Sequence, residues 1–420
     1  MDEMRRARRL VVWVSCGLVC LAAGFEGPIT LKASKVLSAD AVRGPHHTLA
    51  EDVEVEGGYQ LFRVESEYGV IPAAGRTVLR TRLRELDALD QLSEVSQGEV
   101  FVGAAGGAVL SIGKGLAHVA VDPVGTVKGI GGGLKRFGVN LGRKAKRTAE
   151  SVTADDKKGE EAQKSGEQKV VDAADSVLGV GSSARKWARK LGVDPYTTNP
   201  VLHQALVDVG RIDKAGQIVT RVVVPIPTVV TTTASVGDLV WSADPEALLK
   251  RNEQSVASLG VAGDVADRFF RNRSYTLTGQ TRLIEALAAV KAPGCADYVD
   301  AAAEAASERE ALFFVESAEM LAGLHKASPV AAILPDSRAM VARSGGAAVA
   351  LLPFDTLSWT SRVSAAATEI AARGREELGA TALEVRLSGT ATAAAKAGLG
   401  TAGWQVKEGV VDGLTVPPVR

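Results

Sequence analysis

The chain has 420 residues, and its 49 basic side chains balance its 49 acidic ones, so the formal net charge is zero. Two of its three cysteines, Cys16 and Cys20, lie near the start; loss of that segment leaves Cys295 as the only thiol and excludes an intramolecular disulfide. The length allows two or three domains, which must then be stabilised by burial rather than by crosslinks.

The first residues have the pattern of a cleavable secretory signal. Four arginines precede a continuous apolar run over residues 10–21, which is shorter than the roughly 20 residues that a membrane span needs. Ala22 and Gly24 place small side chains where signal peptidase would cut before Phe25. We therefore expect residues 1–24 to be a signal peptide and the mature protein to be exported, to the periplasm or the envelope; an uncleaved membrane anchor is the alternative.

The next segment predicts a small antiparallel sheet covered by a helix. Residues 29–73 are strand-like, with apolar and polar side chains alternating before a Gly57-Gly58 turn. Residues 75–95 then carry leucines at helical spacing, with arginine and glutamate on the other face. We expect residues 25–100 to form one unit, in which the apolar stripe of the helix lies on the sheet.

Residues 101–147 form a glycine-rich basic segment. Eight lysines and arginines stand against Asp122 alone, a net charge of +7, which leaves the rest of the mature chain at −9. After Pro123, apolar residues recur every three or four positions, which predicts a basic amphipathic helix. Lys114 and His118 in the apolar first half argue against a membrane span, because a charge at the bilayer centre costs about 2.5 to 3.5 kcal/mol.

This basic segment is the predicted contact surface. It could lie on an anionic membrane surface, bind another envelope protein, or dock on the acidic body of its own chain. Nucleic acid is not an expected partner, because the protein is exported and Phe137 is the only aromatic residue among the basic ones after Asp122. The candidate contact residues are Lys114, Lys128, Lys135, Arg136, Arg143, Lys144, Lys146 and Arg147.

The middle of the chain predicts a linker followed by helices. Residues 148–169 are almost entirely polar and charged, as in a flexible linker. Residues 170–327 form a mainly helical domain, with one long helix expected over residues 298–325. Residues 218–233 are β-branched but contain two prolines, so they indicate either an edge strand or an irregular buried segment.

The last part predicts a small α/β domain over residues 328–412. Two strands flank Gly345-Gly346, and a helix over 356–373, a strand over 382–387, a short helix and a last strand follow. This ββαβαβ order, together with the N-terminal sheet and the helical middle, predicts an α+β protein. We expect residues 413–420 to be a loose tail.

No motif for chemistry is complete. The glycine-rich stretches match neither a phosphate-binding loop nor a dinucleotide fingerprint, so no cofactor is expected. His46 and His47 near Glu51 and Asp52 form the only local group of metal-ligand types, but adjacent histidines in a strand point to opposite faces, and a solvated loop is the favoured interpretation over a metal site. Residues 388–390 (Ser-Gly-Thr) lie where a strand passes into a helix, a common place for a ligand in α/β folds.

Four segments resemble uncharacterised exported proteins of Gram-negative bacteria. They are GYQLFRVESEYG at 58–69, VDPVGTVKG at 121–129, LGVDPYTTNP at 191–200 and DLVW at 238–241. The resemblance implies a periplasmic address and carries no catalytic residue. The sequence therefore favours a non-enzymatic envelope scaffold or binding protein; the alternative is an enzyme with its site around residues 388–390.

Overall fold

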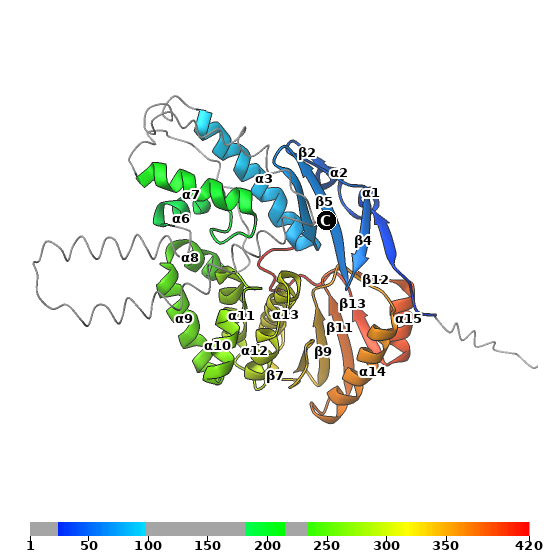
Figure 1. The fold of residues 1–420 in the computed structure, drawn as a ribbon. Coiled ribbons are helices and arrows are strands. Elements are labelled where there is room, and N and C mark those ends of the chain that lie inside the picture. Colours follow the sequence, from blue (N-terminus) through cyan, green and yellow to red (C-terminus); the bar gives the residue numbers. More distant parts are fainter. Residues whose placement is uncertain (1–23, 98–180, 215–233, 420) are drawn as a thin grey trace, which may run out of the picture.

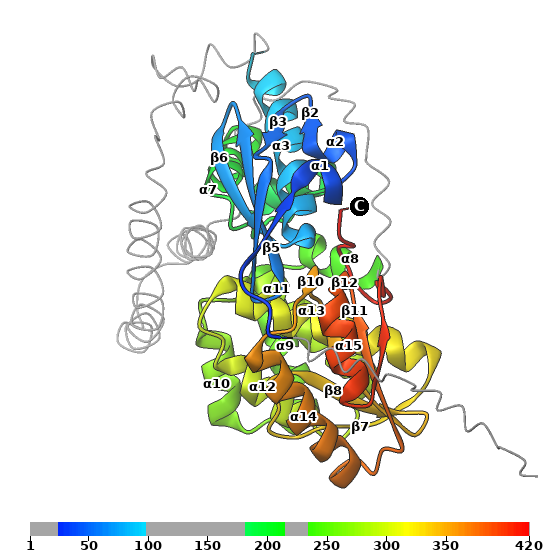
Figure 2. The same cartoon turned by 90° about the vertical axis from the view of Figure 1, so that its right-hand side faces the viewer.

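The computed structural model describes residues 24–97, 181–214 and 234–419, and it is α+β, as predicted. An antiparallel sheet with its helix forms one lobe, and the helical middle packs with the C-terminal sheet in a larger lobe (Figures 1 and 2). The predicted signal peptide, basic segment and linker, and residues 218–233, lie outside the described residues. Within the described ranges, no helix is long and apolar enough to cross a membrane.

The N-terminal sheet is built on one long strand. This central strand, β5 (Tyr59–Ser66), pairs with β6 along one edge and with β4 and then β3 along the other, always antiparallel. Gly57 and Gly58 have φ of +60° and +91°, the left-handed conformation that a tight hairpin turn requires. The other strands and short helices are β1 (Ile29–Lys32), α1 (Ala33–Val36), α2 (Ala39–Val42), β2 (Arg43–Gly44), β3 (His47–Leu49), β4 (Asp52–Glu56) and β6 (Gly69–Ala74).

Helix α3 (Arg76–Gln97) covers this sheet, as the spacing of its leucines predicts. Leu79, Leu86 and Leu89 are fully buried, in the same apolar cluster as Phe62 and Val64 of the sheet. Two further helices, α6 (Ser182–Leu191) and α7 (Pro200–Lys214), join the cluster. The N-terminal lobe therefore has a core of its own, made from two separated parts of the chain.

The expected long helix over residues 298–325 is two helices, and that prediction was wrong. The chain leaves the helix at Glu304 and re-enters it after Ser307, whose hydroxyl accepts a hydrogen bond from the Glu310 amide. The Glu310 carboxylate in turn accepts from the Ala306 amide at 2.7 Å, a reciprocal arrangement close to a capping box. The helices of this region are α8 (Ala234–Ser242), α9 (Pro245–Ser258), α10 (Gly263–Arg271), α11 (Leu277–Val290), α12 (Cys295–Ala303) and α13 (Glu308–Ala327).

The C-terminal sheet has the order β13-β11-β9-β8-β7, with β13, β11 and β9 parallel and the hairpin antiparallel. Its two faces are both apolar: Met340 and Val349 share a core with α11 and α13, whereas Val341 and Ala350 share one with α14 and α15 on the opposite side (Figure 1). These elements are β7 (Val330–Ile333), β8 (Met340–Ser344), β9 (Ala347–Leu352), β10 (Thr356–Leu357), α14 (Ser361–Glu376), β11 (Ala382–Leu387), β12 (Thr390–Ala391), α15 (Ala393–Thr401) and β13 (Trp404–Lys407).

The end of the chain departs from the expected loose tail. Residues 413–419 cross back to the N-terminal lobe, where the Arg80 guanidinium donates a hydrogen bond to the Pro418 carbonyl at 3.0 Å. Leu414 and Val419 are buried in the cores of the two lobes. The tail is irregular in conformation, yet it links both lobes.

Candidate functional site

The predicted contact residues of the basic segment, from Lys114 to Arg147, lie outside the described residues. The structure does place Ser388, Gly389 and Thr390. The Ser388 hydroxyl and the Gly389 amide both donate to the Phe354 carbonyl, at 3.2 and 2.9 Å. A Cβ on Gly389 would lie only 2.1 Å from the Asp355 carbonyl oxygen. These three residues therefore pack a strand end tightly against the neighbouring loop, and none of them lines the cavity described below.

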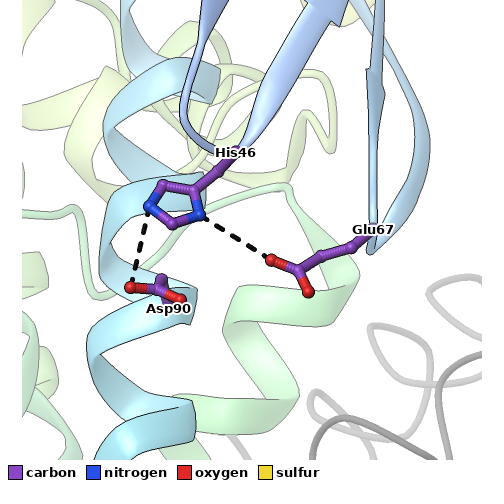
Figure 3. A group of neighbouring side chains, drawn as sticks. All are labelled: His46, Glu67 and Asp90. Carbon is purple, nitrogen blue, oxygen red and sulfur yellow. Dashed lines mark ion pairs between the residues drawn. The ribbon is translucent and has the colours of Figure 1, made fainter.

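The two adjacent histidines do not meet Glu51 and Asp52. His46 instead lies between Glu67 of the β5–β6 turn and Asp90 of α3 (Figure 3). His47 makes a 3.0 Å hydrogen bond with the Ala41 carbonyl. The two rings therefore have separate surroundings, since His46 lies in the turn before β3 and His47 begins that strand.

A cavity of about 220 Å³ lies where the two lobes meet. Its walls come from the first half of α3, the loop before α7, α8, the start of α11, α13 and the C-terminal tail. Apolar side chains form much of the lining, and hydroxyl groups are interspersed among them. The apolar lining residues are Val78, Val193, Val236, Val240, Trp241, Tyr275, Ala311, Leu312, Val315 and Val416; the hydroxyl-bearing ones include Thr77, Thr81, Thr197, Thr198, Thr276, Thr278 and Thr415.

A buried ion pair forms one wall of this cavity. The Arg82 guanidinium donates to the Glu85 carboxylate at 2.8 Å and to the Thr198 hydroxyl at 2.7 Å. Glu85 also accepts from the Asn199 amide group at 3.0 Å and from the Thr197 hydroxyl. The loop before α7 is thereby held against α3, and the Glu85 carboxylate is fully committed to protein partners.

The opposite wall is held by hydrogen bonds to the same loop. The Trp241 indole donates to the Val193 carbonyl at 2.9 Å, and the Thr278 hydroxyl donates to the Asp194 carboxylate at 2.7 Å. Burial raises the pKa of Asp194, although the hydrogen bonds from the Thr278 hydroxyl and the Tyr196 amide act in the other direction. The lining of the cavity is therefore positioned by bonds between α8, α11 and the loop over residues 192–198.

Arg84 is the exception among the charged lining residues. It forms neither a hydrogen bond nor an ion pair with any described residue. Partial burial, followed by the positive charge of Arg80, lowers the pKa of its guanidinium. A half-buried cation whose pKa is shifted by a neighbouring positive charge and by no acid is a favourable place for an anionic group.

Arg282, a buried arginine of the cavity lining, lies near three acids, Glu319, Glu316 and Asp194. Arg282 donates two hydrogen bonds of 2.8 Å to the two oxygens of the Glu319 carboxylate. Burial raises the pKa of Glu316 to about 8, against the attraction of Arg282. One Glu316 carboxyl oxygen has no hydrogen-bond partner among the described residues. Glu316 is therefore a protonated carboxyl near neutral pH.

Asp355 connects the C-terminal sheet to the N-terminal lobe. Its carboxylate accepts from the backbone amides of Gln60 at 2.9 Å and of Arg76 at 3.2 Å. Burial nevertheless raises its pKa to about 6. We refer to Arg82, Glu85, Arg282, Glu316, Glu319 and Asp355 together as the charged junction.

Sequence patterns did not indicate this site. Its residues come from six separate stretches, and none of them forms a recognisable motif. Two of the segments singled out in the sequence, residues 191–200 and 238–241, do supply part of the lining. Comparison with known proteins identifies no matching family model, no similar curated protein and no similar solved structure.

Proposed function

We propose that this chain is an exported, non-enzymatic binding protein of the bacterial envelope, and that it takes a small organic anion in the cavity between its lobes. The observation that carries the proposal is Arg84, a half-buried lining residue without a described partner. An anion placed beside it would supply the counter-charge that the described protein does not.

The size and lining of the cavity define the class of ligand. An engineered apolar cavity of about 150 Å³ accepts benzene, so about 220 Å³ suits a molecule of a similar size that carries one extra polar group. Trp241, Leu312 and Val315 offer apolar surface, and several threonine hydroxyls offer hydrogen bonds. A small aromatic or short-chain carboxylate fits this combination, since ligand sites pair an apolar wall with few polar anchors.

Export and membrane association complete the proposal. The N-terminal signal pattern and the resemblance to exported proteins support an address in the periplasm or envelope. The net charge of +7 over residues 101–147 supports association with an anionic membrane surface or with another envelope protein. Co-sedimentation of the mature protein with anionic vesicles at low salt, reduced at high salt, is the expected result; no binding at low salt would end the membrane part of the proposal.

Ligand binding is tested with paired probes. Benzoate, phenylacetate and hexanoate are each titrated into the mature chain by calorimetry beside the matched neutral amide. We expect saturable binding of at least one carboxylate and at least tenfold weaker binding of its amide, because only the carboxylate can pair with Arg84. Arg84→Gln should remove this preference.

Arg362→Gln is the matched control, since Arg362 is an exposed arginine on α14, outside the cavity lining. It should bind the probe as the unmodified chain does. Equal binding of carboxylate and amide, or an Arg84→Gln variant with unchanged affinity, would show that the cavity does not select an anion and that the proposal is wrong.

A further inference from the structure

A second cluster of ligand-type side chains lies away from the cavity, farther along α3. His46 comes from the β2–β3 turn, Glu67 from the β5–β6 turn and Asp90 from α3, and none of the three lines the cavity. Figure 3 shows the imidazole between the two carboxylates. Three elements distant in the sequence thus bring nitrogen and oxygen donors together, with each carboxylate facing a different nitrogen of the imidazole.

The distances leave these donors unbonded to one another. His46 Nδ1 lies 3.7 Å from a Glu67 oxygen, and His46 Nε2 lies 3.6 Å from an Asp90 oxygen. Both separations are longer than a hydrogen bond. One donor atom from each of the three residues nevertheless falls within 4.8 Å of the others. The cluster is compact enough for a shared ion and is not closed by direct bonds.

The backbones that carry two of the donors are well fixed. In the β5–β6 turn, the Ser66 hydroxyl donates to the Gly69 carbonyl at 2.9 Å and accepts from the Tyr68 amide at 3.2 Å. At the β2–β3 turn, Gly44 pairs with His47 across the hairpin, and the His47 ring is hydrogen-bonded to the Ala41 carbonyl. The Glu67 side chain itself is 61% exposed, so it can rotate to shorten its distance to a ligand.

The charge around the cluster is unbalanced. Glu67, Asp87 and Asp90 lie close together, and no lysine or arginine of the described ranges pairs with them. Burial raises the pKa of Asp87, and only the two histidines act to lower it. The carboxylates of the cluster therefore have no counter-charge from a lysine or arginine of the described ranges.

We propose that His46, Glu67 and Asp90 bind one divalent transition-metal ion of the Zn²⁺ type, with water completing the coordination. An imidazole with two carboxylates is a donor set that zinc accepts, whereas Ca²⁺ and Mg²⁺ prefer oxygen ligands alone. Zinc–ligand distances of about 2.0 to 2.2 Å require a carboxylate that now faces the other ring nitrogen to move toward the nitrogen that binds the ion. The ion would join both turns of the sheet to α3 and so stabilise the N-terminal lobe.

The test uses the mature chain without a histidine tag, stripped with EDTA and titrated with Zn²⁺ by calorimetry. We expect one ion per chain, a saturable rise in melting temperature, and a visible absorption band when Co²⁺ replaces Zn²⁺. His46→Ala and Glu67→Gln should each weaken binding at least tenfold. Because Glu67 is exposed, its variant should keep the fold, which the melting temperature in EDTA verifies.

Two controls separate this site from adventitious binding. Glu65→Gln changes an exposed carboxylate on the same strand, and His203→Gln changes a histidine on α7; both should bind Zn²⁺ as the unmodified chain does. The proposal is overturned if no stoichiometric Zn²⁺ binding occurs, if His46→Ala binds with unchanged affinity, or if Mg²⁺ binds as tightly as Zn²⁺.

Discussion

The C-terminal sheet and the charged junction are stabilised by different kinds of interaction. In the sheet, Met340, Val341 and Leu383 are buried among other apolar side chains, and its ladders join strands that are close in the sequence. At the junction, buried carboxyl and guanidinium groups bond to one another, and Asp355 joins elements 295 residues apart through its bond with the Gln60 amide.

This difference determines how each region should respond to substitution. When a buried apolar side chain is shortened, the loss of stability increases with the volume of the cavity that is left. A buried ion pair behaves otherwise, because removing one partner leaves the other charge without compensation in a poorly solvated place. The junction should therefore be sensitive to single charge changes and to pH, whereas the sheet should be insensitive to pH.

The largest effect is expected for Arg282→Met. The substitution leaves the Glu319 carboxylate without its two 2.8 Å hydrogen bonds and places it beside Glu316 with no cation. We expect the free energy of unfolding at pH 7 to fall by about 3 to 5 kcal/mol, measured by urea denaturation. The loss should be smaller at pH 5, where a carboxyl group can be neutralised by a proton.

Arg268→Met is the matched control for that measurement. Arg268 also contacts several acids, Asp264, Asp300 and Glu304, but all four side chains are largely exposed. Exposed ion pairs contribute about 0 to 1 kcal/mol. A similar small loss in both variants would contradict the distinction between the junction and the surface.

A smaller effect is expected from the pH dependence of Glu316. Its pKa in the folded protein is about 8, above the ordinary value of 4.5. Between pH 4.5 and pH 8, the folded state therefore keeps a proton on Glu316 that the unfolded state has released. The stability contributed by this proton is complete below pH 4.5 and is lost as the pH rises through 8. We expect the unmodified chain to lose roughly 1 to 3 kcal/mol between pH 5 and pH 8.

Glu316→Gln tests this assignment, because an amide of nearly the same shape cannot ionise. Its free energy of unfolding should vary less with pH than that of the unmodified chain and should exceed it at pH 8. The pKa of Asp355 is also raised, to about 6, so its ionisation lowers stability as the pH rises. In the Glu316→Gln variant, the free energy of unfolding should therefore still fall between about pH 4 and pH 6. Glu376→Gln, an exposed change on α14, should follow the unmodified curve; a Glu316→Gln curve that does the same would contradict the raised pKa.

The sequence predicted most of the sheet and little of the junction. The strand over Ala382–Leu387 was predicted at its observed bounds, and the Gly345-Gly346 turn was predicted correctly, because alternation and glycine pairs act over a few neighbouring residues. Helix α14 begins at Ser361, later than expected, since Thr356 and Leu357 pair with β12. That pairing depends on a strand more than thirty residues away.

The candidate site could not be predicted for the same reason. Arg84 has the pattern of an ordinary surface arginine on a helix, and only the fold shows that it is partly buried in the lining of the cavity. The sequence grouped His46 with Glu51 and Asp52, whereas the structure places it between Glu67 and Asp90. Glu67 and Asp90 reach it through two turns and a helix that no local pattern relates to one another.

The smallest expected effect concerns the helix break that the sequence prediction missed. Ser307→Ala removes the hydroxyl that accepts from the Glu310 amide at the start of α13, and loss of such a cap costs about 1 kcal/mol. Thr360→Ala removes the equivalent bond to the Val363 amide at the start of α14, beside the C-terminal sheet. Equal losses of unfolding free energy in urea denaturation would mean that both caps act locally.

The neighbouring Glu308 accepts a hydrogen bond from the Thr198 hydroxyl across the cavity. A loss above about 2 kcal/mol for Ser307→Ala alone would therefore mean that the helix break also sets the position of Glu308, because the loss would exceed that of a local cap.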